Sequence, residues 1–361
     1  LNARGWRVVV VCIALGNTHL PDVQEVDGFT IWRVSPRIFR SRPPRSATKL
    51  AQLVLALPLV LSRIRRARAR VYHAHDFTGL VMTALAGIWR RPVVYDSHEL
   101  FFDRPFRGMP RWMVGLLHLI RPLEGWLARR AVHVIATSEG HAEGLVQNLG
   151  IPYPTLVRNA VDLRVQAEVA ADYSVKASRI IAHTGNLFPT RYVLQQVEAL
   201  AHLPEEIGLV FMGQGPLRDA IIERAAQLGL SSRVQIIPPV PVNSIAPTLA
   251  QADVAMVLID TEAPNDNLAV PNKFYEAVAA GLPMVINPTP EVKRLVERYD
   301  IGVACNAADP ASIADAIQTV LRPDYYERLR ANVQRARAEI TWANEEKKLC
   351  AIYEALLPAK Q

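Results

Sequence analysis

A short segment near residue 275 brings together polar groups of the kinds that bind phosphate and sugar hydroxyls. The sequence "PNKFYEAVAAGLPMV" spans residues 271 to 285. If its middle is helical, at 100° per residue, Asn272 and Glu276 lie in one narrow arc with Lys273 beside them, while apolar residues point the opposite way. A lysine near a helix N-terminus, where backbone N–H groups are free, is suited to binding phosphate. Glu276, one turn further on, could accept hydrogen bonds from ribose hydroxyls.

Helix-terminating residues predict where this helix begins and ends. Pro271 suits a first helical turn, Gly281 suits the end, and Pro283 prevents continuation, so we expect a helix over residues 272–280. The alternative is an ordinary amphipathic helix with a Lys–Glu pair three residues apart, worth a few tenths of a kcal/mol. The spacing alone does not decide between the two.

A second candidate is a histidine in a predicted strand-end loop. His98 stands in "PVVYDSHELFFD" (residues 92–103), directly after an apolar strand-like run and amid carboxylates. A histidine in such a place is a candidate for proton or hydroxyl chemistry, although single histidines are more often structural. His73 and His75, in "VYHAHD", are nearer a strand interior, and we interpret them as packing or supporting groups.

The elements that must position these residues alternate between apolar strand-like runs and helical patterns. A first series of strands is predicted at 7–13, 29–34, 70–75, 92–97, 132–138 and 154–159, and a second at 179–185, 208–213, 233–238, 253–259, 282–287 and 302–306. Apolar strands that alternate with helices indicate parallel sheets covered on both faces, and therefore an α/β fold. The two series predict two doubly wound domains joined near residues 158–174. Ligands of such sheets lie beyond the carboxyl ends of the strands, which is where His98 falls.

Composition limits the classes of protein that fit. The 361 residues suffice for about two domains of ~100–200 residues each. Cys12, Cys305 and Cys350 are far apart and form no CxxC pair, which favours a reducing compartment and buried thiols over a disulfide framework. The net charge of +7 is uneven, because residues 1–165 hold 23 Lys and Arg against 11 Asp and Glu, whereas the remainder is acidic.

The basic half contains the segment "KLAQLVLALPLVLSRIRRARAR", in which an apolar run, residues 50–61, precedes five arginines. The run is shorter than the ~20 residues that a bilayer crossing needs and Pro58 interrupts it, so we expect no membrane span. Two interpretations stay open. The segment is either a surface that rests on anionic lipid, where each Lys or Arg contributes on the order of 1 kcal/mol, or a core helix with a solvated arginine-rich turn. No nucleic-acid-binding signature accompanies the arginines, so we do not expect nucleic acid as a partner.

The segment at 271–285 also resembles the C-terminal donor-site motif of retaining glycosyltransferases of family 4. Other segments follow in that family's order along nearly the whole chain: "VYHAHDFTGL", "VVYDSHELF", "ATSEGHAEGL", "IPYPTLVRNAVDL", "HTGNLFPTRYVLQQVEAL", "GQGPLRDAIIERAAQLGL", "RVQIIPPVP" and "LAQADVAMVLI". The resemblance implies the GT-B fold, in which two Rossmann-like domains face each other across a cleft. It assigns the acceptor side to residues 1–165 and the donor-binding domain to residues 166–361, with the C-terminal helix packing back toward the N-terminal domain.

The resemblance also implies roles for individual residues. Glu276 matches the second glutamate of the family's E-x7-E motif, which binds the donor ribose. Arg191 falls where the family has a Lys or Arg that holds the diphosphate, assisted by Lys273, and His98 matches the histidine that meets the donor sugar near the reacting carbon. The glycines in loops that let the backbone approach the nucleotide are Gly185, Gly213 and Gly215.

Three departures from the family pattern change the expected contacts. Leu268 stands in place of the motif's first glutamate, so contacts to the donor sugar must come from other residues. The nearby candidates are Asp266, Asn267 and Asn272. Asn186 occupies the place of the usual arginine. The chain also opens at "LNARG", which resembles the last turn of a helix, about one βα unit later than the family's first strand and glycine-rich loop.

The implied reaction transfers a hexosyl or N-acetylhexosaminyl group from a nucleoside-diphosphate sugar, with retention at the anomeric carbon. No separate cofactor is implied. No metal is implied either, because no Asp-x-Asp dyad appears and Arg191, Lys273 and a helix N-terminus can neutralise the leaving diphosphate. The implied acceptor is a glycan or a lipid-linked sugar in cell-surface polysaccharide or glycolipid synthesis. The basic first half and the exposed-looking aromatic residues of "FFDRPFRGMPRW" favour a cytoplasmic protein that also binds the inner membrane face peripherally.

Two other classes of protein stay open. A nucleotide-sugar epimerase of the same two-domain form would bind the donor but need no acceptor. A non-catalytic nucleotide-sugar binding protein would bind the donor without turnover, which the departures at Leu268 and Asn186 would allow. A dinucleotide-dependent oxidoreductase fits less well, because "GQGPLR" has Arg218 where the third glycine of G-x-G-x-x-G belongs.

Overall fold

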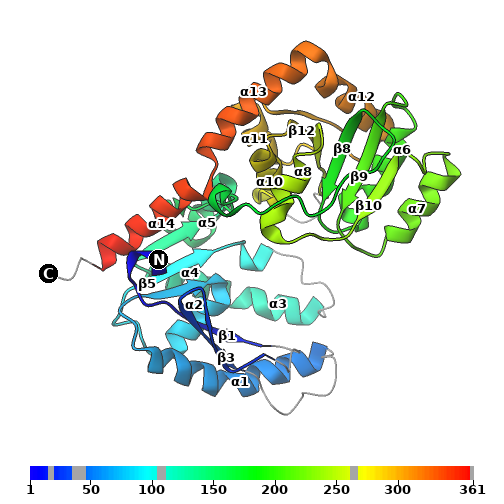
Figure 1. The fold of residues 1–361 in the computed structure, drawn as a ribbon. Helices are drawn as coiled ribbons and strands as arrows, with labels where there is room; N and C mark the ends of the chain where they lie inside the picture. Colours follow the sequence, from blue (N-terminus) through cyan, green and yellow to red (C-terminus); the bar gives the residue numbers. More distant parts are fainter. Residues whose placement is uncertain (15–19, 35–45, 104–110, 261–266, 358–361) are drawn as a thin grey trace. The chain divides into compact units, whose positions relative to one another are not determined.

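The computed structural model describes residues 1–14, 20–34, 46–103, 111–260 and 267–357. The chain divides into two compact units (Figure 1). The first consists of Leu1–Ala136, Ala142–Thr155 and Leu349–Gln361, and the second of Thr137–His141 and Leu156–Lys348.

The first unit contains two β-sheets. One has the strand order β1-β3-β2, where β1 (Val9–Ile13) runs parallel to β3 (Phe29–Val34) and β2 (Val23–Val26) runs antiparallel to it. The other has the order β4-β5-β6-β7, with the bounds Tyr72–His75, Val93–Ser97, His133–Ala136 and Thr155–Leu156. Strand β2 lies outside the predicted series. A tight turn at Asp27 and Gly28, which both have positive φ (46° and 83°), joins it to β3.

This division differs from the single doubly wound sheet predicted for the first half. Strands β1 and β4 each stand at the end of a sheet, and no described strand pairs with the outer edge of either. Strand β1 has the sequence VVVCI, yet all five of its residues are half-buried or exposed. A parallel strand of this composition is usually covered on both faces.

Helices pack against both sheets of the first unit. Their bounds are Ser46–Ala67 for α1, Asp76–Leu85 for α2, Arg111–Leu119 for α3, Arg121–Ala128 for α4, Glu139–Leu149 for α5 and Trp342–Leu356 for α14, the last two being shared with the second unit. Helix α1 packs on β1 and β3, and α2 packs on β4 and β5 (Figure 1). The predicted apolar run lies in α1, with Ala56 and Val60 buried and Leu55 and Leu59 exposed. In the part of the chain that the structure describes, no helix is both long enough and apolar enough to cross a membrane.

A six-stranded parallel sheet forms the centre of the second unit, in the order β10-β9-β8-β11-β12-β13. The bounds are Arg179–Thr184 for β8, Ile207–Met212 for β9, Val234–Ile237 for β10, Val254–Val257 for β11, Met284–Ile286 for β12 and Gly302–Ala304 for β13. Successive residues point to opposite faces, so Leu209 and Phe211 join one apolar cluster while Val210 and Met212 join the other. Burial on both faces explains why these strands are apolar runs.

Helices cover both faces of this sheet, as the sequence predicts. The bounds are Val193–Leu200 for α6, Arg218–Gln227 for α7, Ile245–Leu249 for α8, Asn272–Ala280 for α10, Pro290–Tyr299 for α11, Pro310–Leu321 for α12 and Pro323–Glu339 for α13. Residues of α6, α7 and α12 supply one cluster, residues of α8, α10 and α11 supply the other, and α13 contributes to both (Figure 1). The predicted α/β class, with parallel sheets in both halves, is confirmed.

Candidate functional site

Helix α10 occupies the predicted residues, Asn272–Ala280. Pro271 precedes it in extended conformation (φ −69°, ψ 149°) as the N-cap residue, and Gly281 follows in the left-handed conformation (φ 76°) that ends helices. Phe274 is fully buried in the core of the second unit, whereas Asn272 is exposed and Glu276 is half-buried. The helix therefore packs with its apolar side and leaves an amide and a carboxylate within reach of a ligand.

Glu276 is held by a hydroxyl group at the carboxyl end of strand β8. Thr184, the last residue of that strand, donates from Oγ1 to Glu276 Oε2 at 2.7 Å. Burial raises the pKa of Glu276, while the Thr184 hydrogen bond and the charge of Lys273 act in the opposite direction. A fixed carboxylate at the carboxyl end of a parallel strand is suited to accept hydrogen bonds from the vicinal hydroxyls of a ribose.

Lys273 is buried, whereas the helical arc predicted that it would face a ligand beside Glu276. The residue is 8% exposed, and its Nζ lies 3.4 Å from Nε2 of His183. Burial, followed by the nearby charge of Arg191, lowers the pKa of Lys273 to about 7. The position of a residue on a helix predicts the direction of its side chain but not which elements pack over it. The packing of strand β8 over Lys273 therefore could not be predicted from the local sequence.

A chain of hydrogen bonds joins Lys273 to Arg191. His183 is fully buried, and this burial lowers its pKa, so the imidazole is neutral. With Nε2 accepting from Lys273, His183 Nδ1–H donates to Gln196 Oε1 at 3.2 Å, and Gln196 Nε2 donates to the carbonyl of Arg191 at 2.9 Å. Arg191 closes a short 3-10 turn, Pro189–Arg191, that leads into α6. The two basic residues assigned to the diphosphate therefore belong to one network.

The three predicted glycines lie where the loops after β8 and β9 pack on each other. Gly185 has a φ of 101°, which residues with a side chain rarely adopt. A Cβ at Gly213 would lie 1.8 Å from the carbonyl oxygen of Gly185, and a Cβ at Gly215 would lie 2.5 Å from that of Leu187. The loops are also hydrogen-bonded, since Leu187 N–H donates to the carbonyl of Gln214 at 2.9 Å. This close approach of two backbones accounts for Gly213 and Gly215 before any nucleotide is considered.

The predicted asparagines differ in exposure. Asn186 is exposed between Gly185 and the buried Leu187, and Asn272 is exposed in the first turn of α10. Asn267 is half-buried, as is Leu268. Asp266 lies outside the described residues. Asn186 and Asn272 therefore offer exposed amide groups, the first next to Gly185 in the loop after β8 and the second in the helix that carries Glu276.

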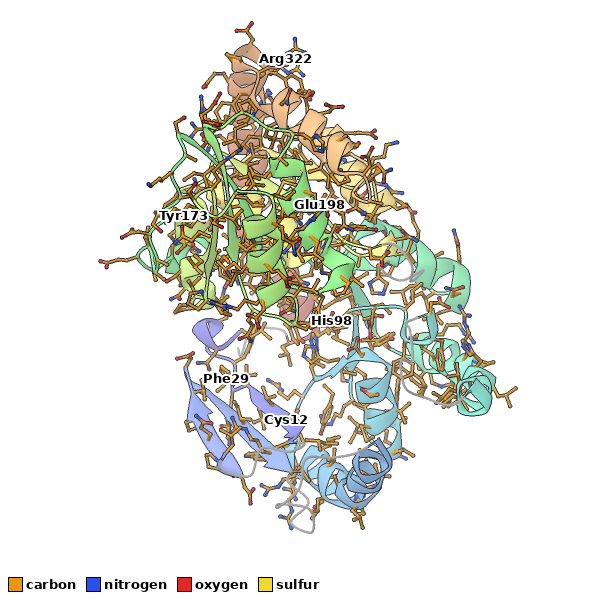
Figure 2. The ribbon with its side chains drawn as sticks, turned by 90° about the vertical axis from the view of Figure 1, so that its right-hand side faces the viewer. Cys12, Phe29, His98, Tyr173, Glu198 and Arg322 are labelled. Atoms are coloured by element: carbon orange, nitrogen blue, oxygen red, sulfur yellow. The ribbon has the colours of Figure 1, made fainter. Side chains whose placement is uncertain are left out.

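His98 belongs to the first unit, directly after strand β5 (Figure 2). The parallel register of β4 and β5 pairs His75 with Asp96. Side chains two residues apart in a strand share a face, so His73 and His75 meet Asp96 there. Asp96 Oδ2 lies 2.9 Å from His73 Nε2, 3.5 Å from His75 Nδ1 and 3.3 Å from His98 Nε2.

Both the backbone and the ring of His98 are held in place. Asp76, which has a left-handed φ of 55°, accepts a hydrogen bond from the backbone N–H of His98 at 3.0 Å. Burial alone would raise the pKa of Asp96, but the hydrogen bonds from His73 and His98 outweigh it and hold the pKa well below its usual range. In return, the hydrogen bond to Asp96 raises the pKa of His98, although burial opposes this. His98 is therefore a positioned imidazole that can donate a hydrogen bond or a proton.

The structure adds residues that sequence reasoning did not select. His183 and Thr184 stand directly before Gly185, at the end of a predicted parallel strand, which is the signal that could have found them. The H-x-H and D-x-H patterns of two neighbouring strands are a similar signal for the group around His98. Tyr353 contacts His73 Nδ1 through its hydroxyl from 280 residues further along the chain, and no local spacing predicts such a contact.

The aromatic residues predicted to be exposed near residue 101 are buried where they are described. Phe101 and Phe102 are 7% and 3% exposed, and their ring centroids lie 5.0 and 5.1 Å from that of Phe77. They lie in a short 3-10 turn, Phe101–Asp103, and pack on helix α2, so the prediction is wrong for these two residues. Residues 104–110 of the same segment lie outside the described part of the chain.

Comparisons with known proteins cover both halves of the chain. A family model described as "Glycosyl transferase 4-like domain" matches residues 1–160, and one described as "Glycosyl transferases group 1" matches residues 168–338. The glycogen synthase of Mycobacterium tuberculosis is 25% identical over 297 residues, which make up 80% of this chain and 69% of that protein. The D-inositol 3-phosphate glycosyltransferase of Xylanimonas cellulosilytica is 30% identical over 162 residues, 44% of this chain and 37% of that protein.

Solved structures match along nearly the whole chain. Sucrose-phosphate synthase from Thermosynechococcus elongatus has a TM-score of 0.74 at 18% identity, covering 99% of this chain and 91% of that one. Anabaena HepE in complex with UDP and glucose has a TM-score of 0.67 at 20% identity, covering 90% of this chain and 86% of that one. At these identities the likeness is one of fold.

Proposed function

Since the chain belongs to the group 1 glycosyltransferases of family 4 and has the GT-B fold, we propose that it transfers a sugar from a nucleoside-diphosphate sugar to a glycan or lipid-linked acceptor. The observation that carries the proposal is the carboxylate of Glu276, which is fixed by Thr184. Thr184 directly follows His183, the residue that links Lys273 to Arg191. One acidic group for ribose hydroxyls and two basic groups for a diphosphate are what a nucleoside-diphosphate sugar requires.

The donor would be bound mainly by the second unit. Glu276 accepts hydrogen bonds from the ribose, and Arg191 neutralises the diphosphate. Lys273 acts from below the surface beside His183, where its pKa of about 7 leaves it partly protonated near pH 7, so it adds less positive potential than an exposed lysine would. Asn186, Asn267 and Asn272 supply amide groups to the sugar and phosphates, in place of the arginine and glutamate that the family more often has.

The transfer itself would proceed with retention and without a metal ion. The acceptor hydroxyl attacks the anomeric carbon on the face from which the diphosphate leaves, and the departing phosphate oxygen takes the hydroxyl proton. The bond from the anomeric carbon to the phosphate oxygen breaks as the bond to the acceptor oxygen forms. His98 donates a hydrogen bond to the donor sugar near the reacting carbon, a role that fits an imidazole fixed by Asp96 and Asp76.

Binding of the donor can be tested by isothermal titration of the purified chain against UDP-, GDP- and ADP-sugars. We expect one base to be preferred. Glu276→Ala should weaken its binding by about tenfold or more, because a charged hydrogen-bond acceptor contributes roughly 1.5–3 kcal/mol. Glu205→Ala, which removes an exposed carboxylate elsewhere in the second unit, is the matched control.

Three outcomes would contradict the proposal. If Glu276→Ala and the control bind every donor as the wild type does, the ribose contact is wrong. If the donor binds but no acceptor or water ever receives the sugar, the chain is a nucleotide-sugar binding protein. Conversion of the bound sugar to its epimer without an acceptor would indicate the epimerase class.

The acceptor side is proposed to bind the inner, cytoplasmic membrane face reversibly. Around the junction of α3 and α4, Leu119 is 74% exposed, and Ile120, Leu123 and Trp126 are also exposed. The guanidinium of Arg130 lies 3.6 Å from the centroid of the Trp126 ring. Apolar side chains beside arginines, in a chain half with an excess of basic residues, suit the interface of an anionic membrane and a lipid-linked acceptor.

Sedimentation with vesicles tests this surface. We expect the chain to sediment at low salt with vesicles that contain phosphatidylglycerol and to stay in the supernatant with phosphatidylcholine alone, because both charge and apolar burial contribute. The double variant Leu119→Ser, Trp126→Ser should lose most of this binding, whereas Leu85→Ser, at another exposed apolar position of the first unit, should keep it. Equal sedimentation of the two variants would show that α3 and α4 are not the membrane surface.

A further inference from the structure

We propose that His73, His75, Asp96 and His98 form a binding site for a divalent transition-metal ion, with Zn²⁺ as the ion that fits best. Three imidazole nitrogens and one carboxylate oxygen are a donor set that zinc uses in proteins. The site lies wholly within the first unit. It goes beyond the proposed function, because the transfer described above uses no metal ion.

Four separations among the donor atoms, the three from Asp96 and the one between His75 and His98, lie near the edge length of a tetrahedron around zinc. Zinc–nitrogen bonds of ~2.0–2.1 Å place neighbouring donor atoms about 3.3–3.4 Å apart. Asp96 Oδ2 lies 2.9, 3.5 and 3.3 Å from the nearest ring nitrogens of His73, His75 and His98. His75 Nδ1 and His98 Nε2 lie 3.3 Å apart. The donor atoms of His73, His75 and Asp96 are all within 4.8 Å of one another, so small rotations about their χ angles bring them to a common ion.

The strand register explains why these four residues converge. His73 and His75 alternate along β4, Asp96 stands opposite His75 on β5, and His98 follows two residues later. A pair of strands therefore supplies three of the four donors from fixed backbone positions. The fourth donor, His98, is fixed by the hydrogen bond from its backbone N–H to Asp76.

The outer contacts are also those of a metal site. A ligating histidine usually binds a protein group through its second ring nitrogen, which fixes the ring. His73 does so, because its Nδ1 contacts the hydroxyl of Tyr353 while Nε2 faces Asp96. The rings of His73 and Tyr353 are stacked with an interplanar angle of 10°.

An ion could reach the site from solvent, and the carboxylate of Asp96 would neutralise part of its positive charge. The side chains of His75 and His98 are 67% and 43% exposed, whereas those of His73 and Asp96 are 21% and 13% exposed. The site is therefore anchored on its inner side and open on its outer side. Asp96 supplies one negative charge, and Asp76 lies next to His98.

Occupation of the site would inhibit the transferase, a consequence that rests on the proposed function. An ion held by His98 Nε2 replaces the proton on that nitrogen, so the imidazole is no longer a cation that can give a proton or a charged hydrogen bond to the donor sugar. Zinc and the donor sugar then compete for one imidazole, and the enzyme is active when zinc is scarce.

Metal binding can be measured without a donor or an acceptor. The untagged, chelator-treated chain is titrated with Co²⁺, whose tetrahedral complexes absorb in the visible range, and with Zn²⁺ by calorimetry. We expect one ion per chain, a cobalt band that Zn²⁺ displaces, and no effect of Mg²⁺, which prefers oxygen ligands. His75→Ala, at an exposed position, should weaken binding by at least about tenfold, and His202→Ala, an exposed histidine of the second unit, should not.

The alternative is that the four residues only hydrogen-bond to one another. Absence of a cobalt band in the wild type, or a band unchanged in both His75→Ala and His98→Ala, would overturn the proposal. Thiolate charge-transfer absorption would instead place the ion at a cysteine. The Co²⁺ and Zn²⁺ titrations use no nucleotide-sugar. A negative result in them would therefore overturn the metal site without affecting the proposed function, which the donor titration tests. In the transferase assay, Zn²⁺ should inhibit the wild type strongly and His75→Ala weakly, each relative to its own zinc-free rate.

Discussion

Glu124 illustrates how strongly burial acts on a single carboxyl group of this chain. It is 3% exposed, within the first unit, and accepts a hydrogen bond from the hydroxyl of Tyr95 at 2.5 Å. Burial raises its pKa to about 7, although the Tyr95 hydrogen bond and the charge of Arg121 act in the opposite direction. The folded protein therefore keeps a proton on Glu124 at pH values where the unfolded chain has released it.

The pH dependence of stability follows from this difference. Between the ordinary pKa of 4.5 and the folded value of about 7, the folded state binds more protons, so its free energy of unfolding falls as the pH rises. At ~1.4 kcal/mol per unit of pKa, the loss is about 3 kcal/mol. Glu124→Gln cannot ionise and should remove this component. Urea unfolding at about pH 5 and about pH 8 measures the slope, with Glu205→Gln as the exposed control, and an equal slope in Glu124→Gln and the wild type would contradict the assignment.

At the scale of single elements, the loops after β8 and β9 in the second unit constrain each other tightly. Their backbones approach so closely that two positions exclude any side chain, Gly213 and Gly215. The same loops lie beside Thr184, the residue that holds Glu276. Packing of one loop on the other therefore sets the position of the carboxylate that is proposed to bind ribose.

Substitution at Gly213 tests this constraint. Gly213→Ala places a Cβ 1.8 Å from the carbonyl oxygen of Gly185, a backbone atom that can move only with its loop. We expect a loss of about 1–3 kcal/mol in the free energy of unfolding, together with weaker donor binding. Gly115→Ala, in helix α3 with no atom within 4 Å of the new Cβ, should be neutral or stabilising. Thermal unfolding measures the stability of both variants relative to the wild type. A Gly213→Ala protein as stable as the wild type would show that the two loops can move apart at little cost.

The elements also show which features the sequence predicts well. Helix α10 begins and ends where predicted because Pro271, Gly281 and Pro283 leave the backbone few alternatives. Strand β2 lies outside the prediction, although Asp27-Gly28 is a strong hairpin signal. The group around His98 could be predicted only in part. The H-x-H and D-x-H patterns are a signal for it, but its contacts depend on the register between two strands and on Tyr353 from the end of the chain.

At the scale of the whole molecule, the α/β class and the family could be predicted because the signals for them are spread along the entire chain. Twelve apolar runs mark strands, and burial on two faces explains the apolar composition of the six in the second unit. The burial of Lys273 could not be predicted, since it depends on His183, 90 residues earlier in the chain. The sequence thus predicts which helices and strands form and at which strand ends the candidate site residues lie. The protonation of Lys273 depends instead on packing between segments that are far apart in the chain.

The outer edge of strand β1 has a consequence for the behaviour of this chain in solution. Its N–H and C=O groups along that edge have no partner among the described strands, and its side chains, VVVCI, are only half covered. Such an edge is a template on which an extended segment of another molecule can add as one more strand. In concentrated samples, chains would then associate through backbone hydrogen bonds, largely independently of ionic strength. Val10→Lys, at an exposed position of β1, would reduce this association, because each added chain would bring a solvated positive charge to the edge.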